Sequence, residues 1–240
     1  MKIIHYCWFG KKIKPTHVEE CINTWREYYP DYIIHEWNED NFNIEDSNEF
    51  VKKAYKDKDW AFVSDYVRLE ALYEYGGIYL DTDVIAIKRM EDLYLSPKNC
   101  ILGFEDPITI GTAIIIAKKN SSFIKQLILA YFDKQQQDYL IPNVVLFSRF
   151  CLKSGAKMDN TNQTLKNDVI IFSNEFFYPK SFISKKIVQT NNTYFIHDFD
   201  SSWVKGNKIK TLVKNVSYKF LGENIYYRFV YMKRKFNGKY

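Results

Sequence analysis

The chain has 240 residues, 46% of them hydrophobic and 26% charged, and it carries a formal net charge of +5. This composition excludes a disordered chain, a collagen-like chain and a coiled coil, and the length suits one domain with a substantial core. Aromatic residues make up 18% of the chain, a share that an AT-rich coding sequence explains better than a sugar-handling function does.

The basic residues gather toward the C-terminal end. Residues 205–240 hold ten lysines and arginines against one acid, Glu223, so the preceding part of the chain is mildly acidic. Residues 222–236 predict an amphipathic basic helix, which either lies in a membrane interface or packs on the domain with its basic side in water. Nucleic acid is not expected as a partner, because no nucleic-acid motif accompanies the basic residues.

The four cysteines, Cys7, Cys21, Cys100 and Cys151, lie too far apart for a CxxC pair or a zinc spacing. The apolar part of the N-terminal sequence is too short for a signal peptide, and no run approaches the ~18 apolar residues that span a bilayer. We therefore expect a cytoplasmic protein with reduced thiols, which acts at the inner face of the plasma membrane if the basic tail binds lipid.

The first predicted elements form a β-α-β unit. Residues 3–9 predict a buried strand, residues 18–29 a helix and residues 32–37 a second strand. Two strands joined by a helix are the signature of a parallel α/β sheet. Residues 38–46 are polar and predict a loop, and residues 50–55 predict a short helix.

A longer helix is predicted over residues 61–74, ended by Gly76 and Gly77. Ser64 and Asp65 within this stretch are also compatible with an internal turn or a cap. The remaining apolar stretches predict strands at 78–80, 84–87, 101–104, 113–117, 169–172 and 194–197, and helices at 123–132 and 146–152.

The segment from Ser64 to Asp83, SDYVRLEALYEYGGIYLDTD, carries the chemistry. Asp81 and Asp83 are two residues apart at the end of an apolar strand, and in extended backbone such side chains project to the same side. Two carboxylates held together repel each other unless a positive charge lies beside them. Oxygen ligands suit Mg²⁺ or Mn²⁺, so the pair predicts a cation site; the alternative is a solvated acidic turn.

Asp65 and Arg68 lie three residues apart on one helix face. Arginine binds phosphate through its fork of donors, so the pair predicts contacts to sugar hydroxyls or a diphosphate. A simple helical salt bridge is the alternative explanation.

Three segments occur in a fixed order: IHYCWFG at residues 4–10, SDYVRLEALYEYGGIYLDTDV at 64–84, and IHDFDSSW at 196–203. Together they resemble the DXD-motif sugar transferases of glycosyltransferase family thirty-two. That family includes bacterial capsular polysaccharide enzymes, fungal initiating mannosyltransferases and the glucosylating domains of bacterial toxins. The resemblance covers roughly residues 1–204.

The resemblance implies an α/β fold of the GT-A type, a Rossmann-like nucleotide-sugar-binding sheet with flanking helices over residues 1–204. Residues 205–240, which the resemblance does not cover, are expected from their charge and amphipathic pattern to be a basic amphipathic extension. The resemblance also implies a nucleotide-sugar donor, a divalent metal (Mn²⁺, or Mg²⁺) and retention of anomeric configuration.

By the same resemblance, Trp8 stacks on the donor base beside the backbone of Cys7, and Asp65 and Arg68 hold the ribose and hexose. Asp81 contacts the ribose and the metal shell, and Asp83 binds the metal directly.

In the last motif the resemblance makes His197 a metal or phosphate ligand, and it makes Ser202 and Trp203 part of a loop over the diphosphate. The alternatives are a satisfied strand-end histidine and a core tryptophan. The motif departs from the usual His-His or His-Trp pattern, so Asp198 or Asp200 is a candidate replacement ligand.

A second departure concerns the segment where the donor sugar is expected. Many relatives carry Asn there, whereas this chain offers Thr109, Gly111 and Thr112. Both departures leave the identity of the sugar open.

We expect a metal-dependent retaining hexosyltransferase that moves a hexose from a nucleotide sugar, favoured as a UDP-sugar, to a glycan acceptor in bacterial surface polysaccharide (capsule) synthesis. A lipid-linked acceptor would suit a peripheral membrane protein. The alternatives are a toxin-like protein glucosyltransferase and a catalytically inactive sugar-nucleotide-binding protein.

Overall fold

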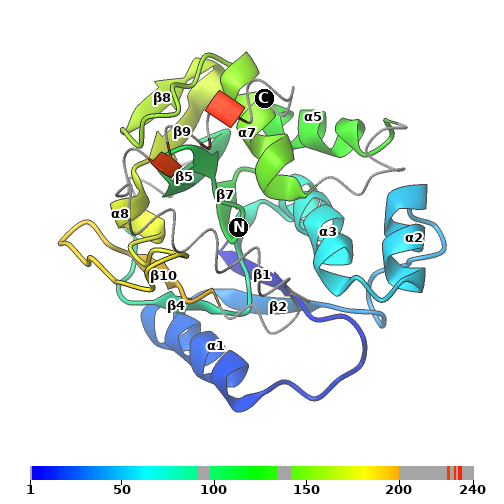
Figure 1. Ribbon diagram of the computed structural model, residues 1–240. Helices are drawn as coiled ribbons and strands as arrows, with labels where there is room; N and C mark the ends of the chain where they lie inside the picture. The colour runs from blue at the N-terminus through cyan, green and yellow to red at the C-terminus, as the bar shows by residue number, and fades with distance from the viewer. Residues whose placement is uncertain are drawn as a thin grey trace.

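The computed structural model describes residues 2–90, 98–133, 142–199, 226–227, 230 and 232–233 (Figure 1). Among these residues, no helix combines the length and the apolar character needed to cross a lipid bilayer.

The predicted β-α-β unit is confirmed. Strand β1 (Ile3–Cys7), helix α1 (Thr16–Tyr28) and strand β2 (Ile33–Trp37) follow in that order, and the two strands pair in parallel. On its other edge β1 pairs in parallel with β3 (Gly77–Leu80). The chain therefore passes from β1 to β2 on one side and later returns to β3 on the other side of β1. In α/β sheets, ligands bind at the carboxyl ends of the strands where the strand order reverses in this way.

Two helices connect β2 to β3. Helix α2 (Glu49–Lys56) begins after Asn48, whose side chain caps it by accepting a hydrogen bond from a backbone N–H of the first turn. Helix α3 (Trp60–Tyr75) ends at Gly76, which has the left-handed φ of 67°. Gly77, with φ 108°, lies so close to the carbonyl oxygen of Ile3 in β1 that a Cβ would overlap it. The glycine pair therefore lets α3 turn directly into β3.

Beyond β3 the sheet becomes mixed. Strand β3 pairs antiparallel with β7 (Ile114–Ala117), and β7 pairs antiparallel with β5 (Cys100–Asp106). Strand β5 runs parallel to β9 (Val169–Phe172), and β8 (Gln163–Leu165) lies at the far edge. The strand order is β2-β1-β3-β7-β5-β9-β8, and β6 (Thr109–Ile110) pairs with β5 beside this path.

A second, two-stranded sheet joins distant parts of the chain. Strand β4 (Val84–Ala86) pairs antiparallel with β10 (Phe195–His197), which places His197 opposite Val84. Helix α1 fixes this sheet, because the indole N–H of Trp25 donates a 2.7 Å hydrogen bond to the carbonyl of Val84.

Apolar side chains cover both faces of the main sheet. The other described helices are α5 (Ser122–Ala130), α7 (Asn143–Lys153), the 3₁₀ turn η1 (Lys166–Asp168) and the short α8 (Asn174–Phe177). One core cluster joins α2, α3, α5 and α7 to one face, and another joins α1, α8, β4 and β10 to the other face. Alternation along β1 serves both clusters, since Ile4 and Tyr6 enter one and Cys7 enters the other.

His5 is a buried polar residue at the centre of this sheet. Its Nδ1 accepts a hydrogen bond from the indole N–H of Trp37 at 3.1 Å, and its Nε2 lies 2.9 Å from the carbonyl of Gly76. The ring therefore carries its proton on Nε2. Burial lowers the pKa of His5 to about 4, although the bond to Gly76 acts in the opposite direction.

The sequence-based elements agree with the structure except at short ones. Strands β6 and β8 and helix α8 were not predicted, and Ser64 and Asp65 lie inside α3 and form no turn or cap. The proposed boundary between residues 204 and 205 lies outside the described residues. Of the predicted tail helix, residues 226, 227, 230, 232 and 233 are described and helical, and Tyr226 and Tyr227 form a buried cluster with Ile108.

Candidate active site

The candidate site lies at the carboxyl edge of β1 and β3. Asp81 directly follows β3, and its backbone N–H donates a 2.8 Å hydrogen bond to the carbonyl of Ala113, just before β7. The N–H of Val84 donates to the carbonyl of Asp81 at 3.0 Å, so residues 81–84 form a turn. The prediction that extended backbone aligns Asp81 and Asp83 was wrong, because the chain turns immediately after β3.

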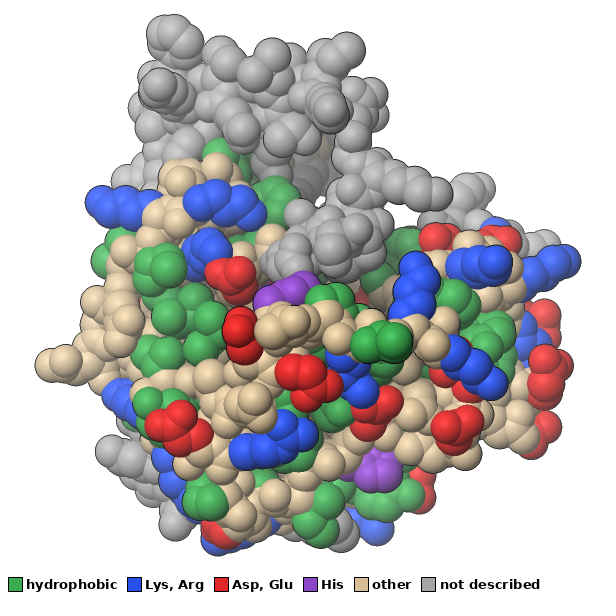
Figure 2. All heavy atoms as spheres, turned by 90° about the horizontal axis from the view of Figure 1, so that it is seen from below, with side chains coloured by type: hydrophobic (Ala, Val, Ile, Leu, Met, Phe, Trp, Pro, Cys, Tyr) green, Lys and Arg blue, Asp and Glu red, His purple; other side chains and the backbone are tan. Residues whose placement is uncertain are grey.

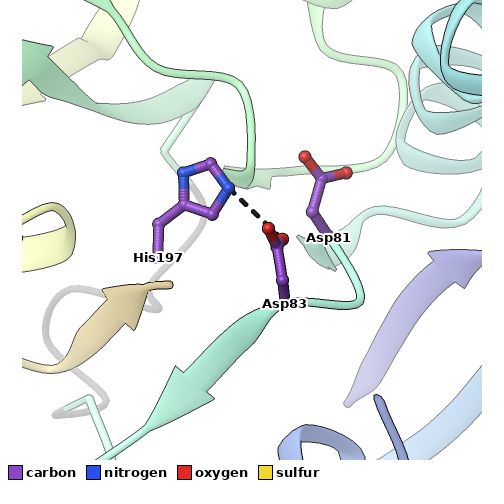
Figure 3. A group of neighbouring side chains, drawn as sticks. All are labelled: Asp81, Asp83 and His197. Carbon is purple, nitrogen blue, oxygen red and sulfur yellow. Dashed lines mark ion pairs between the residues drawn. The ribbon is translucent and has the colours of Figure 1, made fainter. Parts of the chain in front are cut away.

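The turn nevertheless brings the predicted metal ligands together. Asp81, Asp83 and His197 each offer one ligand atom, and these atoms all lie within 4.8 Å of one another. Figure 3 shows the three side chains converging from the end of β3, the start of β4 and the end of β10. His197 Nε2 lies 3.2 Å from Asp83 Oδ1. The fold therefore assembles this cluster from residues more than a hundred positions apart, while its role in metal binding stays a prediction.

His197 shows how charged this cluster is. Burial disfavours the imidazolium, but the carboxylate of Asp83 and more distant carboxylates outweigh burial and raise the pKa of His197 above its ordinary value. The other ring nitrogen, Nδ1, is buried and has no hydrogen-bond partner among the described residues. Figure 3 shows Nδ1 on the side of the ring away from the two aspartates, so the ring nitrogen that faces the cluster is Nε2.

The donor set itself fits a divalent cation. Two carboxylates suit Mg²⁺ and Mn²⁺, and an imidazole nitrogen adds a ligand that transition metals accept more readily than Mg²⁺ does. The residues present, Asp81, Asp83 and His197, therefore fit Mn²⁺.

Asp81 is held in place by the side chains of Tyr79 and Arg68. The phenol O–H of Tyr79 donates to Asp81 Oδ1 at 2.9 Å, and Arg68 Nη2 lies 3.2 Å from the same oxygen. Both contacts use the same oxygen, Oδ1. Tyr79 was not predicted as a site residue, although a tyrosine two residues before Asp81 on a buried strand is placed to reach it.

Arg68 is buried, with 4% of its surface exposed, and its guanidinium is engaged by the protein. Nε donates to the carbonyl of Ser64 at 3.0 Å, and Nη1 donates to the carbonyl of Thr112 at 2.8 Å. Nη2 lies 3.2 Å from both Asp65 Oδ1 and Asp81 Oδ1. The described structure therefore shows Arg68 as the link between two carboxylates, and its predicted contact with a donor sugar or diphosphate stays a prediction.

Asp65 lies on the inner face of α3. Its Oδ2 accepts a hydrogen bond from the backbone N–H of Asn143 at 3.1 Å, and the Asn143 side chain donates to the Asp65 carbonyl at 2.7 Å. Burial raises the pKa of Asp65 to about 6, although the guanidinium of Arg68 favours the ionised form. Asn143, at the start of α7, was missed, because nothing in the sequence connects it to residues 78 positions earlier.

Cys7 and Trp8 end β1 at the same edge. Burial raises the pKa of the Cys7 thiol to about 12, so it is no nucleophile, and the thiol lies near Arg68 and Tyr79. Trp8 is half-buried, and its indole N–H donates to the carbonyl of Lys12 at 2.7 Å. This bond fixes the orientation of the ring, and the predicted stacking of a base on Trp8 stays a prediction.

The segment predicted to lie near the donor sugar is largely buried. Thr109 and Thr112 are 4% and 5% exposed, and the carbonyl of Thr112 is the one that binds Arg68. Gly111 packs directly on the phenol ring of Tyr178, whose oxygen accepts a hydrogen bond from the backbone N–H of Ile114 at 3.0 Å. Gly111 is therefore needed for close packing.

Of the final motif, Asp198 is described, whereas Asp200, Ser202 and Trp203 lie outside the described residues. The backbone N–H of Asp198 donates to the carbonyl of Asp83 at 2.9 Å, and its carboxylate forms an ion pair with Lys180. Its candidacy as a replacement ligand stays a prediction.

The mixed α/β sheet, with an Asp-x-Asp turn at its carboxyl edge, is a fold of the GT-A type, as predicted. Residues 15–103 match the family described as "Glycosyltransferase sugar-binding region containing DXD motif". The chain thus carries a DXD glycosyltransferase region like that of the family its motifs resemble, and the matched range includes Asp65, Arg68, Asp81 and Asp83.

Two curated proteins are similar over part of the chain. The uncharacterized protein At4g19900 of Arabidopsis thaliana is 38% identical over 72 residues, which cover 29% of this chain and 10% of that protein. Glucan organizing enzyme 1 of Cryptococcus neoformans is 37% identical over 84 residues, which cover 31% of this chain and 22% of that protein. The chain therefore matches well under two thirds of the length of these relatives.

One solved structure supports the fold. The PaToxG glycosyltransferase is 17% identical, with a TM-score of 0.51 over 64% of this chain and 68% of that chain. At this identity the likeness concerns the fold alone.

Proposed function

We propose that this protein is a metal-dependent retaining hexosyltransferase. It transfers a hexose from a nucleotide sugar, favoured as a UDP-sugar, to a glycan acceptor in bacterial surface polysaccharide synthesis. The observation that carries the proposal is the convergence of Asp81, Asp83 and His197 at the carboxyl edge of the sheet, inside a chain with a DXD glycosyltransferase region.

A divalent cation bound at this cluster would supply positive charge next to a departing diphosphate. The chain's own residues prepare the place for it. Arg68 and Tyr79 fix one oxygen of Asp81, and the β4–β10 pairing holds His197 beside Asp83. Groups whose orientation is fixed before the reaction need no reorganisation when charge develops, which is the main source of electrostatic catalysis.

The donor side of the proposed site is formed by β1 and α3. The indole of Trp8, oriented by its bond to Lys12, supports stacking of a nucleobase at the end of β1. Asp65 supports hydrogen bonding to sugar hydroxyls, because its carboxylate is fixed by Asn143 and Arg68. In this proposal Asp65 holds substrate and does not act as the general base.

The acceptor and the cellular role rest on the family resemblance. The retaining outcome, the polysaccharide product and a lipid-linked acceptor at the cytoplasmic face of the membrane are proposed from the likeness to capsular polysaccharide enzymes. The name of the Cryptococcus relative refers to glucan, which is consistent with a glycan acceptor.

Two measurements test the proposal. A thermal-shift panel of UDP-, GDP- and CDP-sugars with Mn²⁺ identifies the donor, because a ligand that binds the native state raises the melting temperature according to its affinity. Release of the nucleoside diphosphate from that donor is then measured with Mn²⁺ and with a chelator.

The matched variants are Asp83→Asn and Asp57→Asn, the latter at an exposed carboxylate that ends α2. We expect Asp83→Asn to lower Mn²⁺-dependent turnover roughly a hundredfold or more, since a lost metal ligand removes several kcal/mol of charge stabilisation. Asp57→Asn should behave as the wild type. Full turnover by Asp83→Asn, or full wild-type turnover in the chelator, would contradict the proposal.

A further inference from the structure

A hollow opens at the end of β5, apart from the residues of the Asp81–Asp83–His197 cluster. It encloses about 270 Å³ between the end of β5 and the segment that links α8 to β10. Pockets for drug-sized ligands measure roughly 300–1,000 Å³, so this one suits a single small ring. Its lining includes Glu105, Asp106, Glu175, Phe182, Lys186 and Tyr227.

Ring contacts connect this hollow to the metal cluster. The ring of Phe182 lies 5.4 Å from that of Phe199, which in turn lies 4.1 Å from the ring of His197, measured between centroids. The ring of Phe199 therefore separates Phe182, on the lining of the hollow, from His197 of the cluster.

The hollow lies apart from the donor side. The residues assigned to the donor belong to β1 and α3, whereas the hollow is built by β5, α8 and the segment after α8. Figure 1 shows α3 and α8 on opposite sides of β7, and the cluster of Figure 3 lies between them. Two substrates can thus approach the same cluster from two directions.

The lining is chemically suited to a sugar ring. Glu175 is oriented by Thr190 Oγ1, which donates to Oε2 at 2.8 Å, and by Asn192 Nδ2, which donates to Oε1 at 3.3 Å. Ser173 Oγ also donates to Oε1, at 3.4 Å, so Oε1 accepts two hydrogen bonds. Each carboxylate oxygen has two lone pairs, so Oε2, which accepts one bond, keeps capacity for a ligand hydroxyl. Phe182, with 41% of its surface exposed, and Tyr227 supply flat apolar faces.

Charge narrows the class of ligand. Among the described residues that line the hollow, three carboxylates, of Glu105, Asp106 and Glu175, stand against the ammonium of Lys186. An anionic ring would therefore meet net repulsion, while a neutral or amine-bearing ring would not. Figure 2 shows the molecule from below, and hydrophobic side chains gather on the left of this view. In Figure 1 the left is the side on which α8 and β10 lie.

We propose that this hollow is the acceptor subsite and that it binds a saccharide ring without negative charge. The ring hydroxyls bond to Glu175 and its neighbouring carboxylates, and one ring face lies on Phe182. This inference rests on the proposed function, because the word acceptor presupposes sugar transfer.

Saturation-transfer NMR tests the inference on the full chain without any donor. The probes are methyl β-glucoside, methyl β-galactoside and glucosamine, with glucuronic acid as the anionic comparison, all at millimolar concentration. We expect at least one uncharged or amine-bearing probe to bind and glucuronic acid not to bind. Glu175→Gln and Phe182→Ala should each weaken binding roughly tenfold.

The matched control is Phe132→Ala, an exposed phenylalanine that follows α5. This variant should bind the probes as the wild type does. Binding that neither Glu175→Gln nor Phe182→Ala weakens, preferred binding of glucuronic acid, or no binding of any probe would overturn the inference. Failure of the proposed function is seen separately, as a wild-type protein that neither binds nor cleaves any nucleotide sugar.

Discussion

Arg68 offers the sharpest test of how the site is organised. Arg68→Lys keeps the positive charge but replaces a planar fork by a compact ammonium on a different stem. The guanidinium reaches two carbonyls and the carboxylates of Asp65 and Asp81. A lysine cannot reach all four acceptors, and a hydrogen bond to a charged group contributes about 1.5–3 kcal/mol.

If lysine leaves about two of these hydrogen bonds unmade and the site relaxes in part, Arg68→Lys should lower the free energy of unfolding by about 3 kcal/mol. In a domain of this size that corresponds to a melting temperature roughly 6–12 °C lower. Arg68→Met should cost more, about 3–5 kcal/mol, because it leaves two buried carboxylates without their cation. Arg26→Lys, at an exposed arginine of α1, is the control and should stay within about 0.5 kcal/mol of the wild type.

The assay is thermal unfolding without ligand, followed by unfolding with Mn²⁺ and the nucleotide sugar that the panel selects. If Arg68 links the two carboxylates, the loss of stability appears without any ligand. The reasoning is refuted if Arg68→Lys unfolds at the wild-type temperature and loses only its response to the nucleotide sugar. That result would assign the guanidinium to the donor, as the sequence alone suggested.

Two further predictions concern buried positions. The pKa of His5 is lowered to about 4 in the folded state. Between pH 6.5 and pH 4 the unfolded chain therefore binds more protons than the folded chain does. Acidification through this window should lower the free energy of unfolding by roughly 3 kcal/mol. Denaturant titrations should show a shallower fall for His5→Gln, and parallel curves for the two proteins would refute this. Gly111→Ala should destabilise the protein by about 1–3 kcal/mol, because the new Cβ overlaps the buried ring of Tyr178. Urea unfolding at neutral pH measures this loss, and an unchanged midpoint would show that the ring moves without penalty.

Hydrophobic patterning predicted most of the strands and helices and missed β6, β8 and α8. The strands β1, β3 and β9 are runs of apolar residues bounded by turns, and the Gly76–Gly77 pair marks the end of α3. A two-residue strand such as β6 is too short for any periodicity. The antiparallel direction of β7 was also out of reach, because strand direction depends on the path of distant connections.

The sequence predicted which residues meet in the cluster, but not the backbone geometry that brings them together. Asp81, Asp83 and His197 meet as expected, but through a turn and a two-stranded sheet rather than along one extended strand. The partners of Arg68 and Asp65 were less accessible to sequence reasoning. The carbonyl of Thr112 and the N–H of Asn143 are backbone groups. Because nearly every residue has such groups, the residue type does not predict that they bind Arg68 and Asp65.

The β4–β10 ladder has a consequence for how the protein matures. It is the pairing that sets His197 next to Asp83, and a slip of one position would turn the imidazole to the opposite face. During synthesis, Asp81 and Asp83 therefore leave the ribosome long before His197 does. If the cluster binds a cation as proposed, tight binding begins only after β10 has paired with β4 in the correct register.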